Sequence, residues 1–132
     1  MKTTSVLLFS SLYVLTAGVS LAETRIDVSS PNAGGVTYRV EGSQIVLTKA
    51  GERYTLSGSV VNVGVRCDAD CTVVLTNVAI NTSDAGCVPI NINGHKCAIT
   101  LVDGTVNRFR RSSSAPILVN AGSQVTIKGT GT

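Results

Sequence analysis

The sequence predicts an all-β fold, namely a parallel β-solenoid of about three coils, and two observations support this prediction. A similar segment occurs nearly three times, at Val63–Ile80, Pro89–Val106 and Pro116–Thr132, each with two alternating apolar runs around a small polar corner. Repeats of about 20–30 residues are typical of stacked units that cannot bury an apolar face alone. In addition, no window shows apolar residues at a sustained helical period.

The first 22 residues have the pattern of a secretory signal peptide. Lys2 precedes an apolar stretch, Val6–Leu21, and small residues lead up to Ala22, after which cleavage is expected. Ser, Thr and Gly residues interrupt the apolar stretch. A signal anchor is therefore the less favoured alternative, because a membrane span needs about 20 consecutive apolar residues. We expect a secreted, extracellular protein with no membrane partner.

Removal of residues 1–22 leaves about 110 residues, enough for one small domain. Residues 23–60 predict an N-terminal lead-in segment and β cap, in which short alternating runs are separated by turn residues. Breaks are expected at Gly42-Ser43, Gly51-Glu52 and Gly58-Ser59. Residues 61–132 form the predicted coils. The formal net charge of +3 is too small to indicate a nucleic-acid partner.

Alternation within each repeat predicts which side chains face the core, because successive side chains of a strand point to opposite faces. The expected inward set is Val63, Val65, Val73, Leu75, Ile90, Ile92, Ile99, Leu101, Ile117, Val119, Val125 and Ile127. The expected outward set is Arg66, Thr72, Asn91, Thr100, Asn120 and Thr126. Tyr38 and Tyr54 lie on the apolar phase of the cap strands and are expected in the core.

Four cysteines follow the predicted signal peptide, and an even number in an exported chain favours disulfide bonds. Aligning the repeats places Cys71 and Cys97 at equivalent positions on adjacent coils, close enough for a bond. Alternatively, Cys67 bonds Cys71 across its corner and Cys87 bonds Cys97. Metal binding by Cys67 and Cys71 with Cys87 and His95 is a further alternative, although these spacings differ from those of usual zinc sites.

Five short motifs follow one another in a specific order: Gly51–Val60 (GERYTLSGSV), Val73–Ile80 (VVLTNVAI), Asn81–Gly86 (NTSDAG), Cys97–Asn107 (CAITLVDGTVN) and Val125–Gly131 (VTIKGTG). This succession resembles the secreted, mostly bacterial carbohydrate-binding β-helix proteins, over about Gly51 to Thr132. The resemblance implies a right-handed parallel β-helix that binds acidic plant polysaccharide of the pectin or polygalacturonate type. It also implies frequent use of calcium and no cleavage of the polysaccharide.

Two features depart from that family. Its members continue through further coils, whereas this sequence stops at Thr132 in mid-pattern, which would leave Val125–Lys128 as a bare sheet edge. We therefore expect either a fragment truncated at its C-terminus or end-to-end self-association with another copy. The four cysteines are the second departure.

The candidate ligand-binding residues are Arg108, Phe109, Arg110 and Arg111. A guanidinium group binds a carboxylate bidentately, which suits a uronate chain, and Phe109 would lie against a sugar ring. The chain has no tryptophan and few other aromatic residues, so stacking platforms for neutral sugars are scarce. The alternatives are a solvated loop or a dibasic processing site at Arg110-Arg111.

Asp68, Asp70 and Asp103 are the candidate metal ligands, and calcium is the one cofactor that the sequence indicates, because calcium takes several carboxylate oxygens. Single Asp residues at corners also serve turn chemistry. No outward strand carries the paired carboxylates of a glycosidase, and there is no GxSxG motif. We therefore expect no enzymatic activity, and a polysaccharide lyase fragment is the least favoured hypothesis.

Asn81 begins an Asn-Thr-Ser sequon at an expected turn and is the candidate glycosylation site. The predicted function is non-catalytic binding of an extracellular or cell-wall polysaccharide, which the resemblance indicates to be acidic. The alternative hypothesis is a structural or adhesive surface solenoid that self-assembles.

Overall fold

A computed structural model of the chain describes residues 23–32, 36–83, 87–112 and 114–132. These residues form strands and turns without a helix, which confirms the predicted all-β class. Accordingly, none of them belongs to a helix long and apolar enough to cross a membrane. The predicted signal peptide, residues 1–22, lies outside the described residues.

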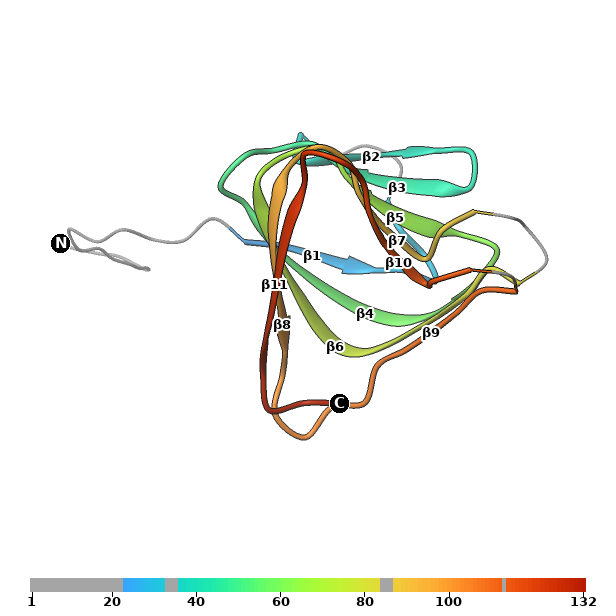
Figure 1. Cartoon of the computed structure of the whole chain (residues 1–132). Helices are drawn as coiled ribbons and strands as arrows, with labels where there is room; N and C mark the ends of the chain where they lie inside the picture. The colour runs from blue at the N-terminus through green and yellow to red at the C-terminus, as the bar shows by residue number, and fades with distance from the viewer. Residues whose placement is uncertain (1–22, 33–35, 84–86, 113) are drawn as a thin grey trace, which may run out of the picture.

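The strands form two sheets (Figure 1). Sheet A has six strands in the order β1-β4-β6-β8-β11, with β9 beside β6. Sheet B has five strands in the order β10-β7-β5-β3-β2. The strands of sheet A are β1 (Glu23–Asp27), β4 (Arg53–Val61), β6 (Cys71–Asn81), β8 (Lys96–Leu101), β9 (Arg108–Arg110) and β11 (Gln124–Gly129). Those of sheet B are β2 (Tyr38–Glu41), β3 (Gln44–Leu47), β5 (Gly64–Cys67), β7 (Ile90–Ile92) and β10 (Ile117–Val119).

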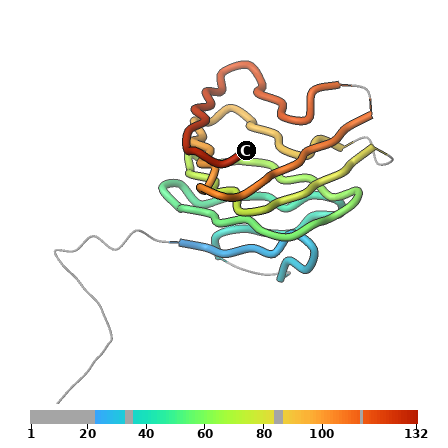
Figure 2. Tube along the Cα trace, turned by 90° about the horizontal axis from the view of Figure 1, so that it is seen from below, coloured from blue at the N-terminus to red at the C-terminus, as the bar shows by residue number. Residues whose placement is uncertain are grey.

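The chain passes repeatedly between the two sheets, and each pass lies beside the previous one. Every pairing among the described strands is parallel except the hairpin β2–β3. Figure 2 shows the passes stacked from β1 at one end of the molecule to β11 at the other. Each repeat therefore pairs with the preceding repeat through its backbone and packs against it through its apolar side chains.

The pairing register confirms the alignment of the repeats. Cys71 pairs with Cys97 across β6 and β8, as the alignment of the two repeats predicts. Ile90 pairs with Ile117 across β7 and β10 in the same way. Because the side-chain period of a strand is two, correct register keeps like residues on the same face through successive passes.

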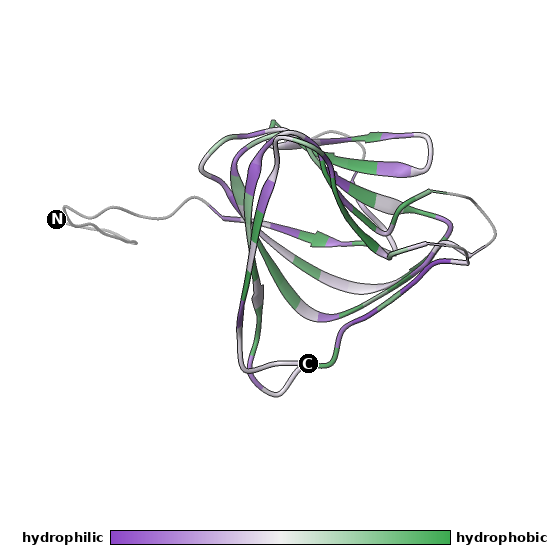
Figure 3. Cartoon of the chain, in the orientation of Figure 1, coloured by the Kyte–Doolittle hydropathy of each residue, from purple (hydrophilic) through white to green (hydrophobic). Residues whose placement is uncertain are grey.

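The core lies between the sheets and consists of the inward residues of each pass, and Figure 3 shows the apolar segments that supply them. Most of the predicted inward set is confirmed. Val65, Val73, Leu75, Ile90, Ile92 and Ile99 are buried, and Val63, Leu101, Ile117 and Val125 pack partly buried against them. Tyr38 and Tyr54 are buried, as predicted.

Two residues of the predicted inward set are exposed instead. Val119 pairs with the buried Ile92, so its side chain is on the predicted inward face of its strand, yet it is 40% exposed. Ile127 pairs with Ile99 and is 52% exposed. Their strands, β10 and β11, are the outermost strands of the two sheets on that side, and no strand among the described residues lies over them. The exposure of Ile127 agrees with the bare sheet edge expected at Val125–Lys128, and the exposure of Val119 has the same cause.

The predicted break at Gly58-Ser59 is wrong. The breaks at Gly42-Ser43 and Gly51-Glu52 separate strands as expected, but β4 runs through Gly58 with a local shift of register against β6. Gly58 has φ +92°, and an added Cβ would lie 2.3 Å from Asp27 Oδ1. The glycine therefore serves an irregularity inside the strand, which is typical of a β-bulge rather than a turn.

Candidate functional site

Strand β9 carries the predicted basic segment on the side of sheet A. Arg108 pairs with Ala79 of β6, Phe109 with Ile80 and Arg110 with Asn81. Phe109 is partly buried and packs against the core, whereas Arg108 and Arg110 are exposed. The two guanidinium groups therefore project outward from the same face of β9.

Two asparagines fix the chain where it turns into β9. The backbone N–H of Val78 donates to Asn107 Oδ1 (2.9 Å), and that of Val106 donates to Asn77 Oδ1 (2.9 Å). Asn77 has φ +60°, a left-handed conformation that Asn tolerates better than most residues. These reciprocal bonds tie the corner before β9 to the corner within β6, and so place Arg108 beside Ala79.

The two arginines line a hollow of about 360 Å³ on the outside of sheet A, which we call the arginine groove. Its lining residues come from three adjacent strands and are Ser59, Val60, Val61, Ala79, Ile80, Asn81, Arg108 and Arg110. Ser59 pairs with Ala79, which pairs with Arg108, so small side chains lie next to the first guanidinium. Val61, Asn81 and Arg110 form the next outward row. The groove thus combines a shallow, largely apolar floor with cationic groups along one side.

Electrostatically, the groove is cationic. No Asp or Glu follows Asp103 in the sequence, whereas Arg108, Arg110, Arg111 and Lys128 do. Neither Arg108 nor Arg110 forms an ion pair with another described residue. Within the described part of the chain, no carboxylate therefore engages either guanidinium group.

The other two predicted binding residues are placed elsewhere. Arg111 turns toward its own loop, where its Nη1 donates to the carbonyl oxygen of Ala115 (3.5 Å). Phe109 packs partly buried against the core and lines a separate hollow of about 180 Å³, so its contact with a sugar stays a prediction. The sequence did not identify the other residues that line the groove, such as Ser59 and Ala79. Their side chains are small and lie on separate strands, so only the strand register shows that they are neighbours of Arg108.

Among the described residues, no tyrosine or phenylalanine ring is fully exposed as a surface on which a sugar could stack. Tyr54 is fully buried, donates to the carbonyl oxygen of Thr37 and accepts a hydrogen bond from the N–H of Lys49 (3.1 Å). Burial raises the pKa of Tyr54. Tyr38 is buried and Phe109 packs against the core. The two described tyrosines are therefore not available for stacking on a sugar, and Phe109 is only partly exposed, in a hollow apart from the arginine groove.

The three aspartates predicted to bind calcium do not converge. Asp68 accepts hydrogen bonds from Arg66 Nη2 (2.8 Å) and Nε (3.0 Å), while Asp103 accepts one from Thr130 (3.0 Å). Asp70 accepts the backbone N–H of Lys96 (2.9 Å), which lowers the pKa of Asp70. These carboxylates are not among the groups of three that the described residues bring within reach of one ion. They do not fit a calcium site of several carboxylates.

A second, more polar hollow of about 330 Å³ lies elsewhere on sheet A. Its lining includes Asp70, Lys96 and Gln124, together with threonines of β6 and β11. Asp70 and His95 also lie near each other, with 3.3 Å between Asp70 Oδ1 and His95 Nδ1. Because this hollow presents both signs of charge, it lacks the uniform cationic character of the arginine groove.

Three of the four cysteines gather in the core, and all four are free thiols in the structure. Cys67 Sγ and Cys97 Sγ are 3.9 Å apart, and Cys71 Sγ lies beside them. Hydrogen bonds from Cys67 and Cys71 lower the pKa of Cys97. Cys87 and His95, which the sequence suggested as partners in a metal site, are not members of this group. The disulfide pairing stays a prediction.

The sequon lies where β6 ends and a turn begins, since Ser83 is a turn residue. Asn81 is the last residue of β6 rather than part of a turn, and its side chain lines the arginine groove. Asn81 Oδ1 accepts the N–H of Ser83 (3.0 Å), and the Thr82 hydroxyl is buried and donates to the carbonyl oxygen of Cys87 (2.7 Å). A glycan on Asn81 would therefore occupy the groove itself.

Comparison with known proteins gives one match. Residues 41–132, which include both hollows and every repeat, match a family described as carbohydrate-binding domain-containing protein. No curated protein and no solved structure shows significant similarity to the chain.

Proposed function

The chain belongs to the family of carbohydrate-binding domain-containing proteins, and from this premise we propose that it binds an acidic polysaccharide in the arginine groove without cleaving it. Family membership supports carbohydrate binding as a non-catalytic role. The acidic specificity is our proposal, and the observation behind it is the pair of outward guanidinium groups of Arg108 and Arg110, which form no ion pair with another described residue.

The surroundings of the two arginines favour a uronate over a neutral sugar. The described tyrosine rings are buried and Phe109 lies outside the arginine groove, so affinity in the groove would come from polar and charged groups. Guanidinium forms short, charge-assisted and often bidentate hydrogen bonds with carboxylate. The floor of Ser59 and Ala79 would leave room for a flat sugar ring, while Asn81 would offer hydrogen bonds to hydroxyl groups.

We further propose that the scaffold is the right-handed parallel β-helix that the sequence predicts. The parallel pairing of successive passes in both sheets supports this proposal. A regular stack of this kind would present Ser59, Ala79 and Arg108 as one row along the stacking direction. An experimental structure of the chain would test the handedness and closure of the coils.

The experiment that tests the proposed ligand class compares binding to polygalacturonate with binding to its fully methyl-esterified form and to a neutral glucan. The two pectic polymers share a backbone and differ in the charge of each carboxyl group. The proposal predicts retention on polygalacturonate that is lost on the ester and on the glucan. Equal affinity for the ester and the acid would overturn acidic specificity while leaving carbohydrate binding in place.

Self-association through the outermost strands is the second candidate function. Val119 and Ile127 expose apolar surface on β10 and β11, and exposed strand edges invite pairing with another chain. Analytical ultracentrifugation across a range of concentrations distinguishes the two candidates. A monomer that binds polygalacturonate supports the binding role, and a concentration-dependent oligomer that binds no polysaccharide supports the structural one.

A further inference from the structure

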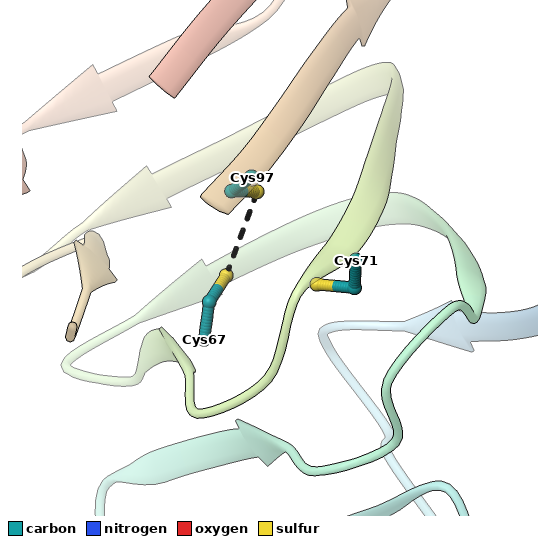
Figure 4. A group of neighbouring side chains, drawn as sticks. All are labelled: Cys67, Cys71 and Cys97. Carbon is teal, nitrogen blue, oxygen red and sulfur yellow. Dashed lines mark hydrogen bonds between the residues drawn. The ribbon is translucent and has the colours of Figure 1, made fainter. Parts of the chain in front are cut away.

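Three cysteine side chains from separate positions in the chain meet at one interior corner (Figure 4). Cys67 is the last residue of β5, Cys71 is the first of β6, and Cys97 lies near the start of β8. Their relative exposures are 0%, 7% and 3%. The corner therefore brings three sulfur atoms together in a site from which solvent is largely excluded.

The distances suit three ligands around one metal ion. The three Sγ atoms lie within 4.8 Å of one another, and the Sγ atoms of Cys67 and Cys97 are 3.9 Å apart. A metal–sulfur bond of about 2.3 Å places three sulfur atoms about 4 Å apart when they surround one ion. The side chains would need only small adjustments to take up that arrangement.

We propose that Cys67, Cys71 and Cys97 form a site for one soft, thiophilic d¹⁰ metal ion, of the copper(I) or zinc(II) class. Thiolate sulfur selects such ions, whereas calcium and magnesium require oxygen ligands. Binding would form three metal–sulfur bonds and release to solvent the protons that the thiols still hold, with no change of oxidation state. Copper(I) would be satisfied by three sulfurs, and zinc(II) would take a water molecule as its fourth ligand.

The site is independent of the arginine groove. It lies in the core of the first passes, whereas the groove lies on the outer face where β4, β6 and β9 meet. The bound ion would join β5 of sheet B to β6 and β8 of sheet A. Because the unfolded chain lacks the assembled ligands, binding of the ion would stabilise the fold.

Titration of the reduced protein under anaerobic conditions tests the proposal. Zinc(II) and copper(I) would be added separately, each against a competing chelator, with proton release and X-ray absorption as readouts. The expected result for at least one ion is one equivalent bound, release of protons from the thiols and a first shell of three sulfurs. A shell of three sulfurs alone identifies copper(I), and three sulfurs with one oxygen identify zinc(II).

Variants assign the ligands. Replacement of Cys67, Cys71 or Cys97 by serine is expected to weaken the ion's affinity at least a hundredfold, whereas Cys87→Ser, the matched control, changes it less than twofold. If a serine variant fails to fold, alkylation of the wild type replaces it. The bound ion should protect three thiols from alkylation and leave Cys87 reactive.

Two results would overturn the proposal. One is the absence of stoichiometric binding of either ion by the folded, fully reduced protein. The other is loss of binding in Cys87→Ser as large as in the three other variants. Rapid formation of a Cys67–Cys97 disulfide on exposure to oxidised glutathione, in a reduced protein that retains neither ion, would assign the cluster to a disulfide instead.

Discussion

Arg108 and Arg110 lie two residues apart on the outer face of β9 and both line the same groove, while the residue between them faces the core. Two residues of strand span about 6.6 Å, so the two guanidinium groups form a short row along β9. A linear polymer with a carboxylate on each sugar would meet both cations at once.

A carboxylate introduced into the groove should weaken polysaccharide binding. Ala79 is the small residue that pairs with Arg108, so Ala79→Glu would place a negative charge next to the first guanidinium. We expect affinity for polygalacturonate to fall at least tenfold, because the new carboxylate competes for the arginine and repels the ligand. Isothermal titration calorimetry measures the change.

Ala79→Gln is the matched control, because it has nearly the volume of Glu without the charge. The loss of affinity for polygalacturonate in Ala79→Gln should be clearly smaller than the loss in Ala79→Glu. The difference between the two losses is the electrostatic contribution. Equal losses in the two variants would mean that the groove excludes them by size, which would remove the support for charge recognition.

The corner before β9 should be needed for both stability and binding. Asn107→Ala removes the acceptor of the Val78 N–H. Because a partly buried N–H without an acceptor is costly, we expect the free energy of unfolding to fall by about 1–3 kcal/mol. Urea denaturation monitored by circular dichroism measures this change.

Asn107→Ala should also weaken polygalacturonate binding under conditions where the variant is folded, since Arg108 follows directly. A variant with wild-type stability would contradict the role given to the Asn77–Asn107 corner. Thr126→Ala on β11, an exposed outward residue, is the control and should leave the free energy of unfolding within about 0.5 kcal/mol of the wild type.

Arg66 of β5 and Asp68, just after β5, form an ion pair whose contribution to the stability of the fold should depend on pH. Partial burial raises the pKa of Asp68, but hydrogen bonds from Arg66 and Asn93 outweigh it and hold that pKa below its ordinary value. A carboxyl group with a lowered pKa in the folded state stabilises the fold above its unfolded pKa of about 3.9. This contribution is lost as pH falls through the folded pKa.

Asp68→Asn tests that dependence. At pH 7 we expect the variant to be less stable than the wild type by at most about 1 kcal/mol, because the pair is partly solvated. The difference should shrink as pH falls below about 4 and vanish once Asp68 is protonated in both states. A difference in the free energy of unfolding that is constant from pH 7 to pH 2.5 would contradict this account.

Calcium should not be required for binding. Asp68, Asp70 and Asp103 are each engaged with other groups and do not gather around one position. We therefore expect the affinity for polygalacturonate to change less than twofold when calcium is removed with EGTA. A more than tenfold loss of affinity that added calcium reverses, and that Asp70→Asn reproduces, would contradict this prediction. It would indicate that these carboxylates bind calcium in the polysaccharide site.

Much of the scaffold was predictable because it rests on local periodicity. Val73 and Leu75 alternate with outward residues, and the repeat of that pattern around Ile99 sets the register of β6 and β8. By contrast, Gly58 looks like a turn residue in sequence and lies inside a strand, because its close approach to Asp27 is visible only once β1 is paired with β4.

The candidate site was predictable only in part. The sequence indicated Arg108 and Arg110 by their charge, but it did not show that strand alternation turns Phe109 to the opposite face of β9, away from the arginine groove. The floor of the groove depends on pairing between separate passes. Likewise, sequence alignment brought Cys71 and Cys97 together, but the addition of Cys67 depends on the path of the corner between β5 and β6.

The most direct test of the central claim is the affinity for polygalacturonate of the double variant Arg108→Gln/Arg110→Gln, measured beside Arg111→Gln. Each groove arginine is expected to contribute about 1 kcal/mol after solvent screening, so the double variant should bind about thirtyfold more weakly. Arg111→Gln, whose guanidinium faces its own loop, should stay within twofold of the wild type. A folded double variant with wild-type affinity, or equal losses in both proteins, would contradict binding in the arginine groove.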